Sequence, residues 1–167
     1  RQLVNTTVLP MDRFVDVVKA IKRAIDAGGR VYWVCPLVDT SGFVDLVAAE
    51  ERFSTLAAHF NDRVGLVHGR LSESKRDKAM SDFANGTFDI LVATTVIEVG
   101  VDVPEATIMV VEQAERFGLA QLHQLRGRVG RSHHQAYAYL MTPPGKTLHA
   151  DAKRRLDAII KLEELGA

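Results

Sequence analysis

Residues 12–36 read DRFVDVVKAIKRAIDAGGRVYWVCP and contain the signals of a helix, a turn and a strand. Apolar residues recur every three or four positions at Phe14, Val17, Val18, Ile21 and Ile25. This spacing predicts an amphipathic helix over residues 12–27, ended by the Gly pair that follows. The next run, VYWVC, is rich in β-branched and aromatic residues and stops at Pro36, which predicts a strand buried on both faces. Tyr32 and Trp33 are therefore expected in the core.

The same alternation continues along the rest of the chain. Further strands are predicted over residues 64–68, 90–94, 107–111 and 136–141, and further helices over residues 44–60, 73–83, 119–125 and 150–165. Strands that alternate with helices are typical of an α/β fold, here a three-layer, doubly wound and mainly parallel sheet. We expect a single domain over residues 1–167, because no repeat or linker interrupts the pattern.

Composition excludes several classes of protein. With 47% hydrophobic and 25% charged residues, the chain is neither disordered nor fibrous. Its longest apolar run, residues 31–38, is far shorter than the ~20 residues of a membrane helix, so no membrane partner is expected. The single cysteine, Cys35, excludes a disulfide scaffold and a cysteine zinc site, and it suits the cytoplasm.

The charges are balanced overall but unevenly distributed. The chain has 21 basic and 21 acidic residues, so its net charge indicates no nucleic-acid partner. Residues 88–115 contain acids and no Lys or Arg, whereas residues 116–150 contain Lys and Arg and no acid. The basic residues of the second segment are Arg116, Arg126, Arg128, Arg131 and Lys146. This switch predicts a cationic surface directed at an anion.

A search for catalytic motifs leaves one candidate. The sequence has no phosphate-binding loop, no nucleophile elbow and no dinucleotide fingerprint. Adjacent His133 and His134 are expected on opposite faces of a strand, which disfavours a shared metal. The remaining motif, QLRGRVGR over residues 124–131, places Arg128 and Arg131 three positions apart, each directly after a glycine. Arginine binds phosphate oxygens in pairs, so the motif indicates an anion site, although a solvated basic loop is the alternative.

Two segments carry a family resemblance. Residues 93–104, ATTVIEVGVDVP, and residues 117–131, FGLAQLHQLRGRVGR, resemble motifs V and VI of the superfamily-two helicases and translocases. The motor of these proteins consists of two RecA-like lobes that close over ATP. Within the superfamily, the chain resembles the double-stranded-DNA translocase families RecG and Mfd over essentially its whole length. Residues 35–41 and 45–51 look more like RecG, whereas residues 132–137 and 161–167 look more like Mfd.

The resemblance implies roles for individual residues. Arg128 and Arg131 match arginine fingers that reach the γ-phosphate of ATP held by the other lobe. Further nucleotide-binding positions implied by the resemblance are Gly100, Asp102, Gln124, Gly127 and Gly130. Thr94 matches a position that contacts the nucleic-acid backbone or relays to it, and Arg70 is a second DNA candidate. RNA contacts are not implied, since Thr95 and Val99 depart from the pattern of the RNA-helicase relatives.

The resemblance also implies partners. It places a first RecA-like lobe, which holds the phosphate loop and Mg²⁺, before this segment of the full-length chain, and a coupling element after it. The implied activity is ATP-driven movement on double-stranded or branched DNA in repair or recombination. The isolated lobe is expected to be monomeric and inactive.

Some interpretations stay open at this point. The GRVG sequence over residues 127–130 also fits a KH-like domain that clamps single-stranded nucleic acid, although that fold has fewer strands. A metabolic α/β enzyme that binds a phosphorylated small molecule is a second alternative, although no general base stands beside the arginines. Gln121 and His123 are assigned either to DNA or to the coupling element.

Overall fold

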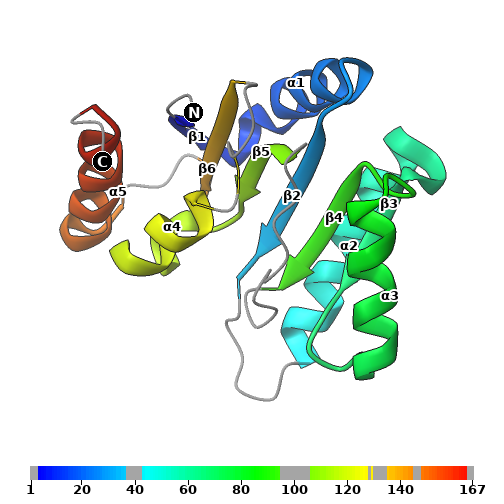
Figure 1. Ribbon diagram of the computed structural model, residues 1–167. Helices are drawn as coiled ribbons and strands as arrows, with labels where there is room; N and C mark the ends of the chain where they lie inside the picture. The colour runs from blue at the N-terminus through cyan, green and yellow to red at the C-terminus, as the bar shows by residue number, and fades with distance from the viewer. Residues whose placement is uncertain are drawn as a thin grey trace.

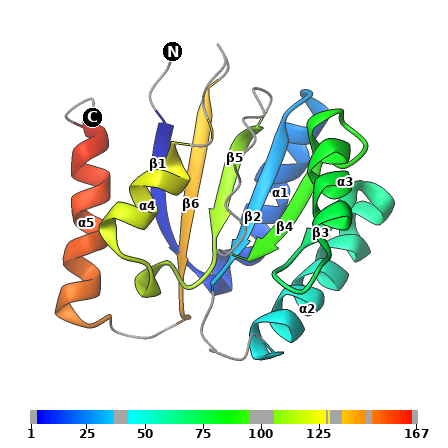
Figure 2. The same cartoon turned by 60° about the horizontal axis from the view of Figure 1, so that its bottom comes forward.

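The computed structural model describes residues 4–36, 43–94, 106–127, 129, 135–144 and 148–164. Within them, six strands form one sheet in the order β1-β6-β5-β2-β4-β3, and all neighbouring strands are parallel. Figure 2 shows the strands side by side in this order. Their bounds are β1 (Val4–Pro10), β2 (Arg30–Cys35), β3 (Val64–Val67), β4 (Ile90–Thr94), β5 (Ala106–Val111) and β6 (Ala136–Thr142).

Helices cover both faces of the sheet (Figure 1). Their bounds are α1 (Phe14–Asp26), α2 (Phe43–Phe60), α3 (Glu73–Ala84), α4 (Leu119–Arg126) and α5 (Ala150–Glu164), with short 3-10 turns η1 (Met11–Arg13), η2 (Asn61–Arg63) and η3 (Ala114–Arg116). Side chains of α1 and α2 pack in one core, and those of α3, α4 and α5 in the other. Strand β2 contributes to both cores, since Tyr32 lies in one and Trp33 in the other. The predicted three-layer α/β architecture is confirmed.

The first helix and strand follow the predicted pattern closely. Val17, Val18 and Ile21 are buried on one side of α1. Gly28 has φ +92° and donates its N–H to Ile25 O at 2.9 Å, which ends the helix as the Gly pair indicated. The predicted first turn is a 3-10 turn, η1, rather than α-helix. Tyr32 and Trp33 are both 0% exposed, so their prediction as core residues is confirmed.

One strand was absent from the sequence prediction. No element was expected before residue 12, and this was wrong, because β1 pairs with β6 from Val4 opposite Ala136 to Pro10 opposite Thr142. The stretch VNTTVLP contains β-branched residues, which was the available signal. Its partner lies more than a hundred residues away along the chain, and local periodicity carries no information on such a pairing.

Candidate nucleotide and nucleic-acid interface at the carboxyl edge

The parallel strands place several polar residues at one edge of the sheet. The residues that end or follow β3, β4 and β5 are His68, Thr94 and Glu112. In open α/β sheets, ligands bind at this carboxyl edge. Of the predicted site residues, the structure describes Arg70, Thr94, Gln124 and Gly127. The other predicted positions, Gly100, Asp102, Arg128, Gly130 and Arg131, lie outside the described residues, as do His133 and His134.

Thr94 is the last residue of β4 and pairs in register with Cys35 of β2. Its side chain is 2% exposed, and its Oγ1 has no hydrogen-bond partner among the residues that the structure describes. A buried hydroxyl that has no partner is unfavourable by about 1–3 kcal/mol, so a hydrogen bond to this hydroxyl would be stabilising. The predicted role of Thr94 in contacting or relaying to DNA stays a prediction.

Arg70 lies in the turn between β3 and α3 and is exposed. Its backbone N–H donates to His68 Nδ1 at 3.2 Å, and Leu71 N–H donates to His68 O at 3.2 Å. Partial burial lowers the pKa of His68, and the positive charge of Arg70 lowers it further, against the opposing effect of Glu50. A neutral imidazole therefore shapes the turn that presents Arg70.

Helix α4 leads directly to the predicted arginine motif. Gly118 donates its N–H to Gln121 Oε1 at 3.0 Å, so the Gln121 side chain caps the first turn of α4. Gly127 ends the helix with φ −69° and ψ −10°, and its N–H donates to His123 O at 3.1 Å. This conformation is open to any residue, so the backbone at Gly127 does not itself require glycine.

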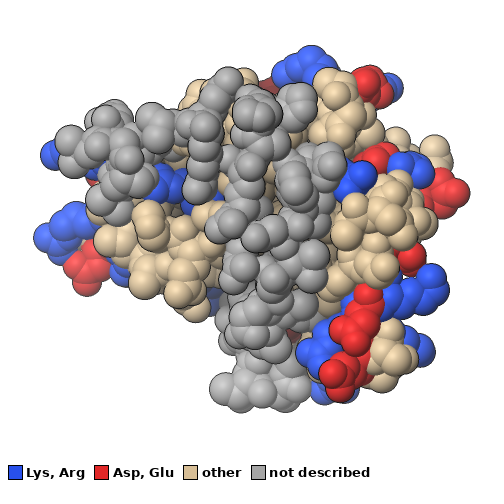
Figure 3. All heavy atoms as spheres, in the orientation of Figure 1, with Lys and Arg blue, Asp and Glu red and all other residues tan. Residues whose placement is uncertain are grey.

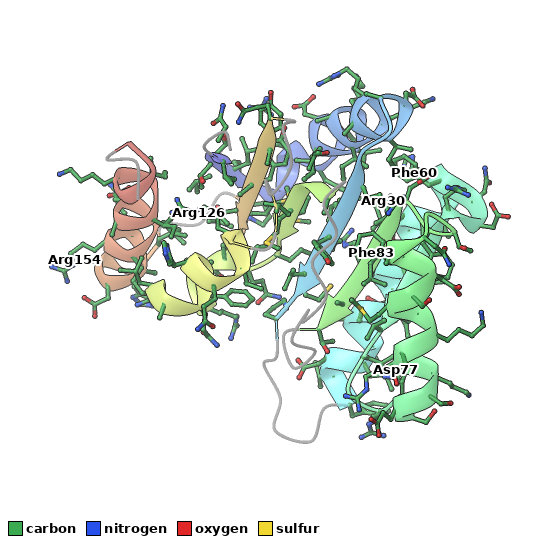
Figure 4. All side chains as sticks on the ribbon, viewed as in Figure 1. Arg30, Phe60, Asp77, Phe83, Arg126 and Arg154 are labelled. Carbon is green, nitrogen blue, oxygen red and sulfur yellow. The ribbon has the colours of Figure 1, made fainter. Side chains whose placement is uncertain are left out.

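Helix α5 holds this segment in place. Arg126 is 7% exposed, and its Nη1 donates to Ile159 O at 2.9 Å. Figure 4 shows Arg126 between α4 and α5. Arg155 of α5 donates to Glu115 O at 2.7 Å and to Phe117 O at 3.1 Å. The sequence analysis assigned Arg126 to a cationic surface, and this was wrong, because its guanidinium is buried between two helices.

Sequence reasoning also missed the role of a cluster around Glu112, which it had counted only as one acid in an acidic stretch. The Glu112 carboxylate accepts hydrogen bonds from Trp33 Nε1, from Arg52 Nε at 2.8 Å and from Arg52 Nη2 at 3.0 Å. The Cys35 thiol lies 3.6 Å from the same carboxylate. Burial raises the pKa of Cys35, and the nearby Glu112 charge raises it further, so the reactive thiolate form is disfavoured. An acid directly after a buried strand was the available signal.

The described part of the surface carries both charge signs. Figure 3 shows Lys and Arg mixed with Asp and Glu where α3 lies, rather than one cationic face there. Within the described ranges, no group of three or more His, Cys, Asp or Glu is arranged to hold a metal ion. Among those same residues, no helix is both long and apolar enough to cross a membrane. A cavity of about 500 Å³ lies at the opposite, amino edge, near Gly28, Thr107 and Gln135, and it includes none of the predicted site residues.

A comparison with known families decides the relationship. Residues 14–133 match the helicase conserved C-terminal domain. The chain belongs to this family. It is 46% identical over 167 residues to the transcription-repair-coupling factor of Escherichia coli K12. The aligned region covers 100% of this chain and 14% of that protein. It is 47% identical over 143 residues to the ATP-dependent DNA helicase RecG of Thermotoga maritima, covering 84% of this chain and 18% of that protein.

Solved structures agree with the family. A structure of RecG bound to a three-way DNA junction matches with a TM-score of 0.80 and 42% identity, over 99% of this chain and 22% of that one. Saccharomyces cerevisiae Dbp5 bound to RNA and ADP BeF₃ matches with a TM-score of 0.65 at 19% identity, which shows the shared fold alone. The RecA-like fold of a second helicase lobe is thus confirmed, and so is the resemblance to RecG and Mfd. The comparisons support neither the KH-like domain nor the metabolic enzyme.

Proposed function

We propose that this domain is the second motor lobe of an ATP-dependent DNA helicase or translocase that acts on double-stranded or branched DNA during repair or recombination. The observation that carries the proposal is the match of residues 14–133 to the helicase C-terminal domain, together with relatives named as a DNA helicase and a transcription-repair-coupling factor. The domain spans 14% and 18% of those two relatives, so the complete motor is a larger protein. Its place of action is the cytoplasm, where DNA and ATP are available.

In this proposal, each lobe supplies a different part of the ATP site. The first lobe holds the phosphates and Mg²⁺, because the 167 residues contain no phosphate-binding loop of their own. The second lobe supplies the positive charge of Arg128 and Arg131, carried on the segment that follows α4. Guanidinium groups suit this task because they keep their charge and bind phosphate oxygens through two parallel hydrogen bonds.

The remaining proposed contacts surround the two arginines. Asp102 accepts hydrogen bonds from the ribose hydroxyls, since a carboxylate is an acceptor. Gly100, Gln124, Gly127 and Gly130 border the nucleotide. Thr94 and Arg70 act on the DNA side. The exposure of Arg70, and the buried Thr94 hydroxyl that lacks a described partner, support this division.

The test replaces Arg128 or Arg131 by Ala in the full-length protein. The kcat for DNA-stimulated ATP hydrolysis should fall on the order of 10² to 10⁵, and the upper part of this range is typical of arginine fingers. The KM for ATP should change much less, because the interaction strengthens in the transition state. Arg128→Lys should restore little, since an ammonium lacks the paired planar geometry. The matched control is Arg154→Ala on α5, whose side chain is 75% exposed, and it should leave turnover unchanged.

The contrary result is equally clear. Near-normal turnover of Arg128→Ala and Arg131→Ala, together with a much lower Tm, would show that both arginines have a structural role. The proposal of arginine fingers would then be wrong.

A further inference from the structure

Glu112 occupies the point where the chain leaves β5. Its N–H donates to Val34 O at 2.9 Å, so the pairing between β5 and β2 extends one residue beyond the strand. Its carboxylate accepts hydrogen bonds from the Trp33 indole and from two nitrogens of Arg52. The Arg52 guanidinium also lies over the ring of Phe14, 4.8 Å from its centroid. Strand β2 and helices α1 and α2 therefore all contribute to holding this one residue.

Stability alone is a poor explanation for this largely buried ion pair. The side chains of Arg52 and Glu112 are 20% and 13% exposed. Removing two such charges from water is unfavourable, and replacement of a buried ion pair by well-packed apolar residues is often neutral or stabilising. A buried pair of this kind is useful where it specifies one geometry. The next question is which geometry depends on Glu112.

The chain changes faces of the sheet directly after Glu112. The Glu112 side chain contacts Trp33 in the α1 and α2 layer, whereas Ala114 and Phe117 are buried in the core of α3, α4 and α5. Between them, Gln113 has φ 48° and ψ 50°, a left-handed conformation that is unfavourable for a residue with a Cβ atom. Such a conformation persists when its surroundings hold it on both sides. Glu112 holds one side, and the core contacts of Ala114 hold the other.

The segment that starts here ends at the arginine motif. It runs through η3 and α4 to Gly127, immediately before Arg128. Its later part is attached to α5 through the hydrogen bonds of Arg126 and Arg155. Among the described residues, the hydrogen bonds of the Glu112 carboxylate link the side chains of this segment to α2 and β2.

We propose that Glu112 is a positioning residue for ATP hydrolysis: by pairing with Arg52 and Trp33, it sets the direction in which the segment carrying Arg128 and Arg131 leaves the sheet. This inference rests on the proposed function, because it requires the two arginines to act on ATP. Glu112 itself touches no phosphate. Its carboxylate oxygens are already occupied by Arg52 and Trp33, so it acts through the arginines.

The experiment uses the full-length protein with two substitutions together, Glu112→Gln and Arg52→Met. The amide oxygen of Gln still accepts from Trp33 Nε1, and Met retains the apolar stem of Arg52, so both charges disappear without a buried unpaired ion. We expect the Tm to stay within a few degrees of the parent and the kcat for ATP hydrolysis to fall about 10-fold, the loss that a modest misplacement produces. The KM for ATP should change less than about 2-fold, because transition-state contacts are the ones affected.

The decisive measurement combines these substitutions with Arg128→Ala and Arg131→Ala. If Glu112 acts through the arginines, its substitution should cause no further loss of kcat once they are absent, because residues that act as a unit are not additive. A further 10-fold loss in the arginine-free background would overturn the inference, as would an unchanged kcat in the wild-type background. Failure of the proposed function would look different, since the arginine substitutions alone would then have no effect.

A matched control comes from the amino edge of the sheet. Asp89 forms a two-bond pair with Arg63 there, so Asp89→Asn with Arg63→Met makes the same chemical change away from the arginine segment. We expect kcat to remain unchanged in that variant. An equal loss in both double variants would show a general effect on the fold and would contradict a specific role for Glu112.

Discussion

The two edges of the sheet each contain an Arg–carboxylate pair with nearly the same geometry. At the amino edge, Arg63 donates to Asp89 at 2.7 and 2.9 Å. At the carboxyl edge, Arg52 donates to Glu112 at 2.8 and 3.0 Å. The surroundings differ, because the Arg63 side chain is 46% exposed and that of Arg52 is 20% exposed. Equal hydrogen-bond distances therefore do not imply equal energies, since water screens the first pair more strongly.

The two ion pairs also differ in the further hydrogen bonds that join the segments on which their residues lie. Arg63 and Asp89 are joined again through their backbones, with Asp89 N–H donating to Arg63 O at 2.9 Å. Arg63 additionally donates to Gly86 O, and nearby Arg30 donates to Ala84 O at the end of α3 (Figure 4). Several hydrogen bonds at the amino edge thus connect the same neighbouring segments. Glu112 is also joined to β2 through its backbone, because its N–H donates to Val34 O, but its link to Arg52, 60 positions away on α2, is made by the carboxylate.

The largest expected difference is in folding stability. Glu112→Ala leaves the Arg52 charge and the Trp33 N–H buried without this acceptor, and it should lower the free energy of unfolding by about 3–5 kcal/mol. Asp89→Ala should lower it by about 1 kcal/mol or less, because Arg63 remains in contact with water. Urea denaturation of both variants checks the comparison. Equal losses would show that burial does not separate the two pairs.

A smaller difference is expected in the response to salt. A double-mutant cycle on Arg63 and Asp89 should give a coupling of about 0.2–1 kcal/mol at 0.1 M NaCl, falling toward zero at 1 M NaCl. The same cycle on Arg52 and Glu112 should change proportionally less over this range, because buried pairs are screened less. The measurement is the free energy of unfolding of each parent, single and double variant at both salt concentrations. If the coupling energies of both pairs fell by the same proportion between 0.1 M and 1 M NaCl, the Arg52–Glu112 pair would not be more desolvated than the Arg63–Asp89 pair.

The smallest expected effect concerns His68, which lies at the carboxyl edge but is only partly buried. Burial lowers its pKa in the folded state, so below about pH 6.5 the unfolded chain takes up a proton more readily than the folded one. The contribution of His68 to folding stability is therefore fully present above about pH 6.5. It is lost as the pH falls through the pKa of His68 in the folded state. His68→Gln should remove this part of the pH dependence of the free energy of unfolding. The pH dependence near pH 8, where His68 does not titrate, should stay unchanged. Denaturation between pH 5 and pH 8 measures it, and an unaltered slope would exclude the effect.

Local sequence pattern predicted most of the elements. Apolar spacing in α1, the φ +92° glycine after it and the apolar run of β2 each depend on residues within one short window. Strand β1 escaped prediction, because its stability comes from pairing with β6 and from one buried face. The β-branched residues of β1 are a weak signal by themselves, because strand propensity depends strongly on which neighbours the strand packs against.

The candidate site divides in the same way. The sequence by itself determined the α/β class and the arginine motif, because hydrophobic periodicity and glycine spacing act over a few residues. Tertiary structure alone decided that Arg126 is buried against α5 and that Glu112 pairs with Arg52. Both outcomes depend on which strands and helices become neighbours in the sheet. The spacing of charges along the chain does not contain that information, since contacts between distant residues arise only when the layers pack.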